Sequence, residues 1–209
     1  MPVINIIPSA GGGGGLGPII YEGENLTPAG GFSGAPATAK AALLARLTVS
    51  GTDSMESGHA DFDTLNGATI SANGVTGTIT TDVNNIFTNS LTTGGLYATH
   101  GTFFALIGGD GFDPTTTIAF STPVAAFWFE MTDAGDFLGQ VTVKVNKTGG
   151  GSVTYNVTHT KDSGKSGTLV FWGIVDDTDT YDSMVLDVSN NDDTIGIDRW
   201  GMATHAQLV

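Results

Sequence analysis

Short, regularly spaced strands constrain this chain more than any other feature of its sequence. From residue 60 onward, runs in which apolar and polar residues alternate are separated by turns rich in glycine and aspartate. Such a relay is typical of antiparallel sandwiches and barrels. The predicted strands cover residues 103–107, 116–120, 123–131, 138–146, 152–159, 168–175, 183–188 and 195–202, after a threonine-rich meander over 69–81.

One of these runs predicts the centre of a sheet. Residues 123–131 place Phe127 and Phe129 on one face and Trp128 on the other, so both faces are apolar. A strand that is apolar on both faces is covered on both sides. The glycine-rich residues 147–151 join two alternating runs and predict a hairpin.

The sequence divides into three predicted parts. Residues 1–36 are rich in glycine and proline and predict an extended arm without a core of its own. Residues 37–51 combine alanine and leucine in a short helix over 37–48, followed by a connector. Residues 52–209 are predicted to form the β-sandwich. The apolar residues at the start of the arm predict a segment that docks on a partner: Val3, Ile4, Ile6 and Ile7.

Charge and composition exclude several classes of partner. The 209-residue chain has 7 Lys+Arg against 21 Asp+Glu, a net charge of −14. This balance argues against nucleic acid and against a polybasic membrane patch. No window approaches the roughly 18 apolar residues of a membrane span. The absence of cysteine excludes disulfides and thiolate metal sites, and the absence of a signal-peptide pattern favours synthesis in a host cytoplasm.

Aspartate-rich loops are the candidates for metal binding. Oxygen-rich loops suit calcium, which takes about 6–8 oxygen ligands. Ordinary aspartate turns, which need no metal, are the alternative interpretation. One candidate group lies in a single loop and the other could meet between the first and last strands: Asp176, Asp177 and Asp179 in the first, and Asp61, Asp63 and Asp198 in the second. No other cofactor is predicted.

Tests for catalytic motifs give little. The Gly164-Lys165-Ser166 triplet lacks the upstream glycine of a phosphate loop, because residue 159 is His. A glycosidase needs two facing carboxylates, and Glu130 has no evident partner in the sequence. We therefore predict that the chain is not an enzyme. Trp200 and Tyr181 are candidate glycan contacts, with core packing as the alternative.

Four stretches resemble the jelly-roll domains of exported bacterial proteins of the PEP-CTERM type, which carry C-terminal sorting tails. The matching stretches are residues 60–65, 118–127, 167–175 and 195–200. The resemblance covers about two thirds of the chain and implies a sandwich like those of concanavalins or carbohydrate-binding modules. The predicted fold class is therefore all-β: an antiparallel jelly-roll-like β-sandwich with a glycine-rich N-terminal arm and one short helix.

Two functions follow as hypotheses. A jelly roll that carries an apolar arm but neither an export signal nor a sorting tail favours a non-enzymatic structural protein of a phage virion. It would be a capsid decoration or tail/fibre-associated protein, anchored by its arm to other virion proteins or to copies of itself. The alternative is a secreted or surface carbohydrate-binding or adhesin module that binds a glycan.

Overall fold

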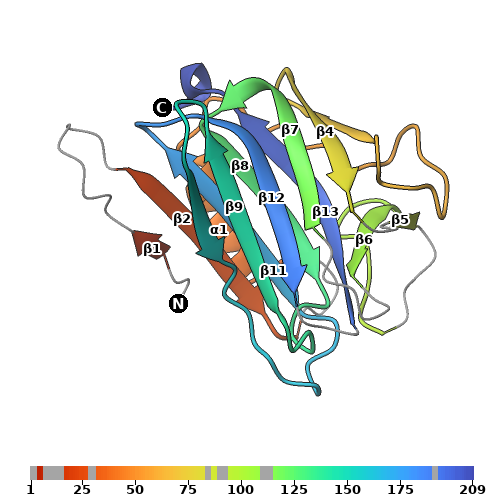
Figure 1. Ribbon diagram of the computed structural model, residues 1–209. Coiled ribbons are helices and arrows are strands. Elements are labelled where there is room, and N and C mark those ends of the chain that lie inside the picture. Colours follow the sequence, from red (N-terminus) through yellow and green to blue (C-terminus); the bar gives the residue numbers. More distant parts are fainter. Residues whose placement is uncertain are drawn as a thin grey trace.

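Two antiparallel sheets packed face to face form the body of this protein (Figure 1). The computed structural model describes residues 4–6, 17–27, 32–82, 86–88, 94–108, 115–189 and 193–209. The first sheet has the order β1 (Ile4–Ile6), β2 (Pro18–Asn25), β11 (Leu169–Asp176), β8 (Ala126–Thr132), β13 (Thr194–Ala203), β6 (Phe104–Gly108) and β5 (Ile86–Thr88). The second has the order β10 (Ser152–Asn156), β9 (Gln140–Lys147), β12 (Tyr181–Ser189), β7 (Thr115–Val124), β4 (Val75–Thr81) and β3 (Thr69–Ala72).

The strand order confirms the predicted jelly roll. Apart from the β9–β10 hairpin, strands β6 to β13 alternate between the sheets, so that β6-β13-β8-β11 in one sheet lies over β7-β12-β9-β10 in the other. This is the arrangement of an eight-stranded jelly roll. The predicted hairpin is also present, since β9 and β10 pair antiparallel across the turn at residues 148–151.

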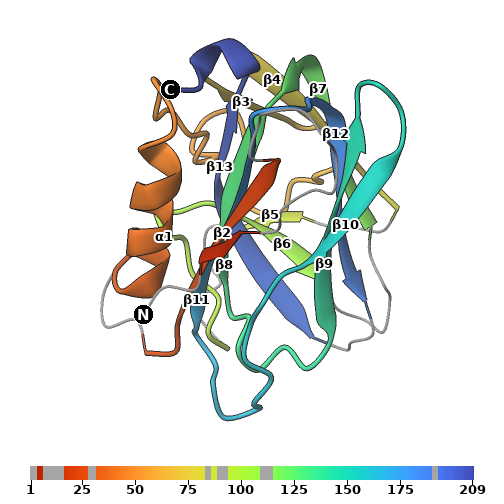
Figure 2. The same ribbon diagram turned by 90° about the vertical axis from the view of Figure 1, so that its left-hand side faces the viewer.

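Strand β8 is covered on both faces, as its sequence predicts. Phe127 and Phe129 belong to the main core between the two sheets, where Phe129 stacks on Trp172 at 5.6 Å between ring centroids. Ala126 and Trp128 belong to a second core on the outer face of the same sheet. The short helix α1 (Ala35–Leu44) covers that outer face and buries Ala39 and Leu43 against it. Figure 2 shows α1 on the side of the seven-stranded sheet that faces away from β9 and β10.

Glycine makes the close approach of α1 possible. A Cβ atom placed on Gly23 of β2 would overlap the carbonyl oxygen of Ala35, and one on Gly173 of β11 would overlap the side chain of Leu43. The predicted helix covers residues 37–48, whereas α1 begins at Ala35 and ends at Leu44. Its start is thus two residues earlier than predicted, and its end is four residues earlier. After β13 the chain forms a 3-10 turn, η1 (His205–Gln207). Val209 then donates its backbone N–H to the carbonyl oxygen of Arg46, which lies two residues after the end of α1.

The predicted domain boundary at residue 36 is wrong for β2. Pro18–Asn25 pairs with β11 along its whole length, and Ile19, Ile20 and Tyr21 are buried. Because glycine and proline residues flank this segment on both sides, its composition did not predict a strand. The strand nevertheless supplies apolar side chains to both cores. The helix is likewise part of the sandwich body, because its buried face packs on β2 and β11.

Candidate functional site

The N-terminal strand lies at an open edge of the seven-stranded sheet. β1 pairs antiparallel with β2 through three residue pairs, Ile4 with Tyr21, Asn5 with Ile20 and Ile6 with Ile19. Of the four residues predicted to dock, Ile4 and Ile6 therefore lie in a strand, while Val3 and Ile7 lie outside the described residues. The described part of the predicted docking segment, Ile4–Ile6, thus forms sheet structure, here against its own chain.

Strand β2, in contrast, is fixed to the sandwich by its side chains. Glu24 accepts hydrogen bonds from the backbone N–H of Thr160 at 2.7 Å and from its hydroxyl at 2.8 Å. Glu22 is buried and accepts a bond from the Thr158 N–H at 3.3 Å, and this burial raises the pKa of its carboxyl. The boundary between arm and body therefore lies before β2, near residue 17.

Each aspartate of the predicted calcium loop is bonded to a protein group. The buried Asp176 carboxylate accepts bonds from the Thr178 N–H at 2.9 Å and from the Tyr181 hydroxyl at 2.6 Å. Burial opposes ionisation of Asp176, but these hydrogen bonds outweigh it and lower its pKa. Asp177 pairs with Arg46 at 2.7 Å, and Asp179 pairs with Lys147 at 2.6 Å.

The second predicted calcium group is dispersed. Asp198 is buried on β13 and accepts bonds from the Thr99 hydroxyl and the His100 N–H, both at 2.9 Å. Asp63 is exposed in the loop before β3, where it accepts a bond from the Ala60 N–H at 2.6 Å. Within the described ranges, no three acidic or histidine side chains come together as a metal-binding group. The structure thus does not assemble the predicted calcium ligands, Asp61 included.

The two predicted glycan contacts are in the core, so this prediction is wrong. Trp200 has an exposed fraction of 0% and packs 5.7 Å from Phe129 between ring centroids. Tyr181 is 1% exposed and directs its hydroxyl to Asp176. A sugar cannot stack on a ring that is enclosed by other side chains. A register shift between Asp198 and Gly201, with Arg199 at a φ of 52°, turns Trp200 toward the main core.

A charged cluster between α1 and the sheet was not predicted. Glu130 of β8 is fully buried, and its Oε1 lies 2.6 Å from Lys40 Nζ on α1 and 3.8 Å from Arg199 Nε. Asp198 lies directly opposite Glu130 on the neighbouring strand. Burial raises the pKa of Asp198 to about 7, against the hydrogen bonds from His100 and Thr99, and the charge of Glu130 adds to the increase.

This cluster supplies the carboxylate partner that the sequence did not reveal for Glu130. The two facing carboxylates, Glu130 and Asp198, are both enclosed, at 0% and 1% exposure. Glu130 contacts Lys40 on α1, and Asp198 contacts Thr99 and His100 in the segment before β6. The two carboxylates therefore attach the helix and this segment to the sheet. A glutamate inside an apolar strand was the available signal, because a buried charge requires a partner.

Comparisons with known proteins do not assign the chain to a family. No protein-family model matches the chain, and no curated protein matches it. The K2 cleaved adhesin domain of Lys-gingipain is 15% identical, with a TM-score of 0.48 over 76% of this chain and 96% of that one. TmCBM61, solved with β-1,4-galactotriose, is 14% identical, with a TM-score of 0.32 over 59% of this chain and 88% of that one.

A phage protein is also among the similar structures. The enzymatically active domain of bacteriophage CBA120 tailspike protein 4 is 15% identical, with a TM-score of 0.35 over 72% of this chain and 21% of that one. Similarity at this level carries no argument about the ligand or partner of this chain. Among the described residues, no helix has the length and apolar character that crossing a membrane requires.

Proposed function

We propose that this chain is a non-enzymatic structural protein of a phage virion, a capsid decoration or tail-associated subunit anchored by its N-terminal arm. Its partners are other virion proteins or further copies of the chain. It is made in the host cytoplasm and resides in the particle. The anchor is the segment up to residue 17, and the body begins at β2.

The position of β1 carries this proposal. β1 is an edge strand held by three residue pairs, and eleven residues with a five-glycine run separate it from β2 along the chain. A hairpin between neighbouring strands needs only about two to five connecting residues. The long connection lets the same strand pair with β2 of its own chain or with a sheet edge of a neighbour. Strand addition of this kind is a common mode of attachment.

The alternative function predicted from the sequence is a secreted or surface carbohydrate-binding or adhesin module. The two residues predicted as its glycan contacts do not support it. Trp200 and Tyr181 are both enclosed in the sandwich. The proposal therefore depends on the arm and not on a sugar-binding face built from these rings.

Deletion of residues 1–16 tests the proposal. We expect the full chain to assemble and the shortened chain to be a monomer by light scattering after size exclusion. Its circular dichroism should be unchanged, because β2 and its contacts remain. A full chain with Ile4→Asp and Ile6→Asp should behave like the deletion. Asn5→Asp is the control, because it introduces an aspartate into the same strand without removing an apolar residue. An assembly state that is the same with and without the arm would contradict anchoring between copies of the chain and leave only attachment to another virion protein.

A further inference from the structure

The loop before β3 presents an aromatic ring to solvent. Phe62 has an exposed fraction of 61%, and it is the one aromatic residue among the large hydrophobic side chains that are exposed in the described part of the chain. The others are Leu26, Leu138 and Val209. Exposure of a single apolar side chain is common in proteins, so the surroundings of Phe62 decide whether it has a role.

The backbone of Phe62 adopts a conformation that phenylalanine disfavours. Its φ is 67°, in the left-handed region, where a bulky side chain costs about 1–3 kcal/mol. Glycine would adopt this conformation without cost. The fold therefore does not require phenylalanine here, and strained residues of this kind concentrate at binding sites.

Hydrogen bonds to β5 fix the strained conformation. Phe62 donates its backbone N–H to the carbonyl of Phe87 at 2.8 Å, and Phe87 donates its own to the carbonyl of Asp63 at 2.8 Å. His59 stacks on the buried Phe87 ring, with 3.8 Å between ring centroids. The ring of Phe62 is thus exposed on a backbone that is already ordered, so a ligand need not order it.

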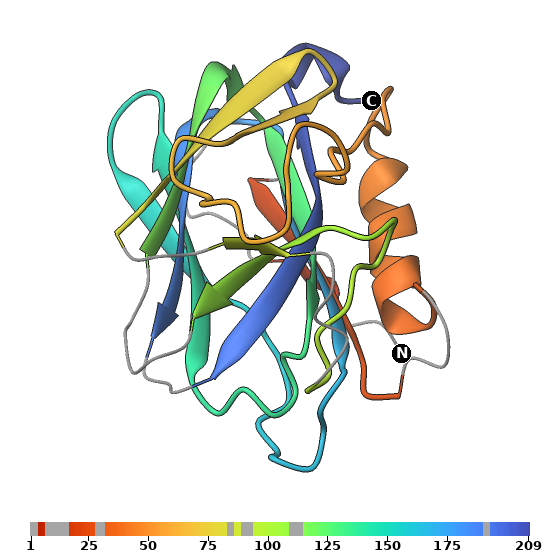
Figure 3. The same ribbon diagram turned by 90° about the vertical axis from the view of Figure 1, so that its right-hand side faces the viewer.

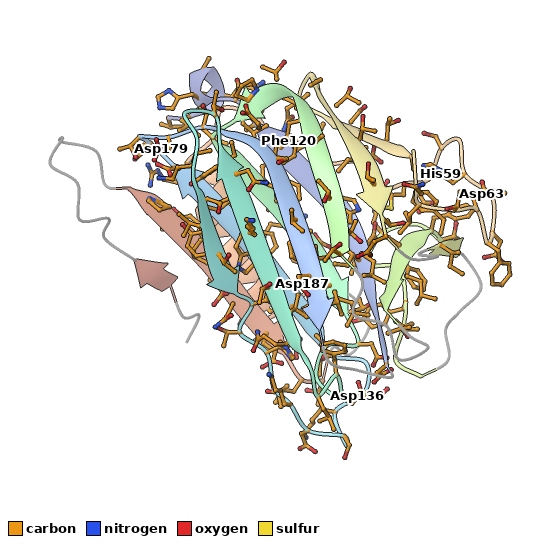
Figure 4. All side chains as sticks on the ribbon, in the orientation of Figure 1. His59, Asp63, Phe120, Asp136, Asp179 and Asp187 are labelled. Atoms are coloured by element: carbon orange, nitrogen blue, oxygen red, sulfur yellow. The ribbon has the colours of Figure 1, made fainter. Side chains whose placement is uncertain are left out.

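The neighbours of Phe62 are polar. Figure 4 places His59 and Asp63 at the end of the molecule opposite β1, and Figure 3 views the molecule from this end. Exposed residues of the same loop include Ser57, Gly58, Ala60, Asp63, Thr64 and Asn66. A stable protein interface buries about 800 Å² on each partner, and its centre is apolar. One ring within a polar surround is too small for that, but it matches the face of one sugar ring.

We propose that the loop of residues 58–64 is a glycan-binding site in which the Phe62 ring stacks on a neutral sugar. A pyranose presents C–H groups on its face and hydroxyls on its rim. Phe62 supplies the apolar surface, and the exposed Asp63 carboxylate accepts hydrogen bonds from hydroxyls. The net charge of −14 disfavours acidic polysaccharides. The site is independent of the arm, because it lies at the other end of the molecule.

Ligand-observed NMR on the full chain tests this inference. The probes are neutral cello-, xylo-, malto- and galacto-oligosaccharides at millimolar concentration, with oligogalacturonate as the acidic counterpart. We expect at least one neutral probe to bind and oligogalacturonate to bind more weakly. Phe62→Ala and Phe62→Gly should weaken binding by about tenfold or more, whereas Phe62→Tyr should retain it. Leu138→Ala, which removes another exposed apolar side chain (56%), should change nothing.

Phe62→Gly separates binding from folding. Because glycine removes the strain, this variant should melt at the same temperature as the parent chain or higher while losing the sugar. Failure of every neutral probe to bind the parent chain would overturn the inference. So would binding that survives Phe62→Gly, or an oligomer that dissociates on Phe62→Ala, which would make the ring a protein contact. Deleting the arm should leave binding unchanged.

Discussion

Lys40 of α1 lies 2.6 Å from the carboxylate of Glu130, a fully buried residue at the centre of the seven-stranded sheet. The pair joins the helix to β8, and the two residues are 90 positions apart in the chain. Arg199, at 3.8 Å, is the second cation near the same carboxylate oxygen. The helix is therefore attached to the sheet by an enclosed ion pair as well as by the packing of Leu43.

Removing the lysine should destabilise the fold. Lys40→Met leaves Glu130 buried with only the more distant Arg199, and loss of one partner of a buried pair costs about 3–5 kcal/mol. Urea denaturation would measure the change. Lys147→Met is the matched control, because its partner Asp179 is 43% exposed and such pairs contribute about 0–1 kcal/mol. Equal losses in the two variants would show that Glu130 does not need Lys40.

Stability should also depend on pH through Asp198. Its pKa is about 7 in the folded chain, chiefly because of burial, and about 3.9 when unfolded. The folded state holds the proton more tightly, so this stabilisation is complete below about pH 4 and is lost as pH rises through 7. Asp198→Asn should remove this loss. The melting temperature of the variant relative to the parent chain should therefore rise between about pH 4 and pH 7 and stay level above pH 7.

The matched control for that experiment is Asp182→Asn, which neutralises an exposed carboxylate on the other sheet. Its melting temperature relative to the parent chain should change little over the same range. A constant difference between Asp198→Asn and the parent chain at all pH values would refute the prediction.

The surface of β2 beneath α1 should not accept a side chain at Gly23. Gly23→Ala places a methyl group against the carbonyl oxygen of Ala35, which belongs to the backbone and cannot rotate away. We expect a loss of about 1–3 kcal/mol in the free energy of unfolding, the usual cost of overpacking. Gly149→Ala, in the β9–β10 turn, meets no atom within 4 Å and should lie within about 0.5 kcal/mol of the parent chain. A neutral Gly23→Ala would mean that α1 can shift on its sheet.

Alternation within strands carried the prediction of the fold. Residues 126–132 are buried along their whole length, as the two apolar faces of the predicted strand 123–131 indicated. Residues 169–176, predicted as a strand over 168–175, are buried along their whole length as well. β2 escaped prediction because local composition is a poor guide when a strand sits among glycines and prolines. Its partner, β11, lies more than a hundred residues away in sequence, so only tertiary pairing reveals it.

The polar contacts were harder to predict, because they depend on side-chain direction across distant elements. Strict alternation would place Asp198 and Trp200 on the same face of β13. The irregularity at Arg199 separates them, with Trp200 in the main core and Asp198 beside Glu130. The exposed Phe62 gave no signal, since its neighbours in sequence resemble any aspartate-rich turn.

The strand order also governs when this protein can fold during synthesis. Within the seven-stranded sheet, β2 waits for β11, and β8 lies between β11 and β13, the last strands to leave the ribosome. Strand β2 thus spends most of translation without β11, and sheets built from such distant pairs form slowly. A chain stopped before β11 leaves the β11-facing edge of the apolar strand β2 unpaired, so nascent chains of this protein should depend on chaperones until synthesis is almost complete.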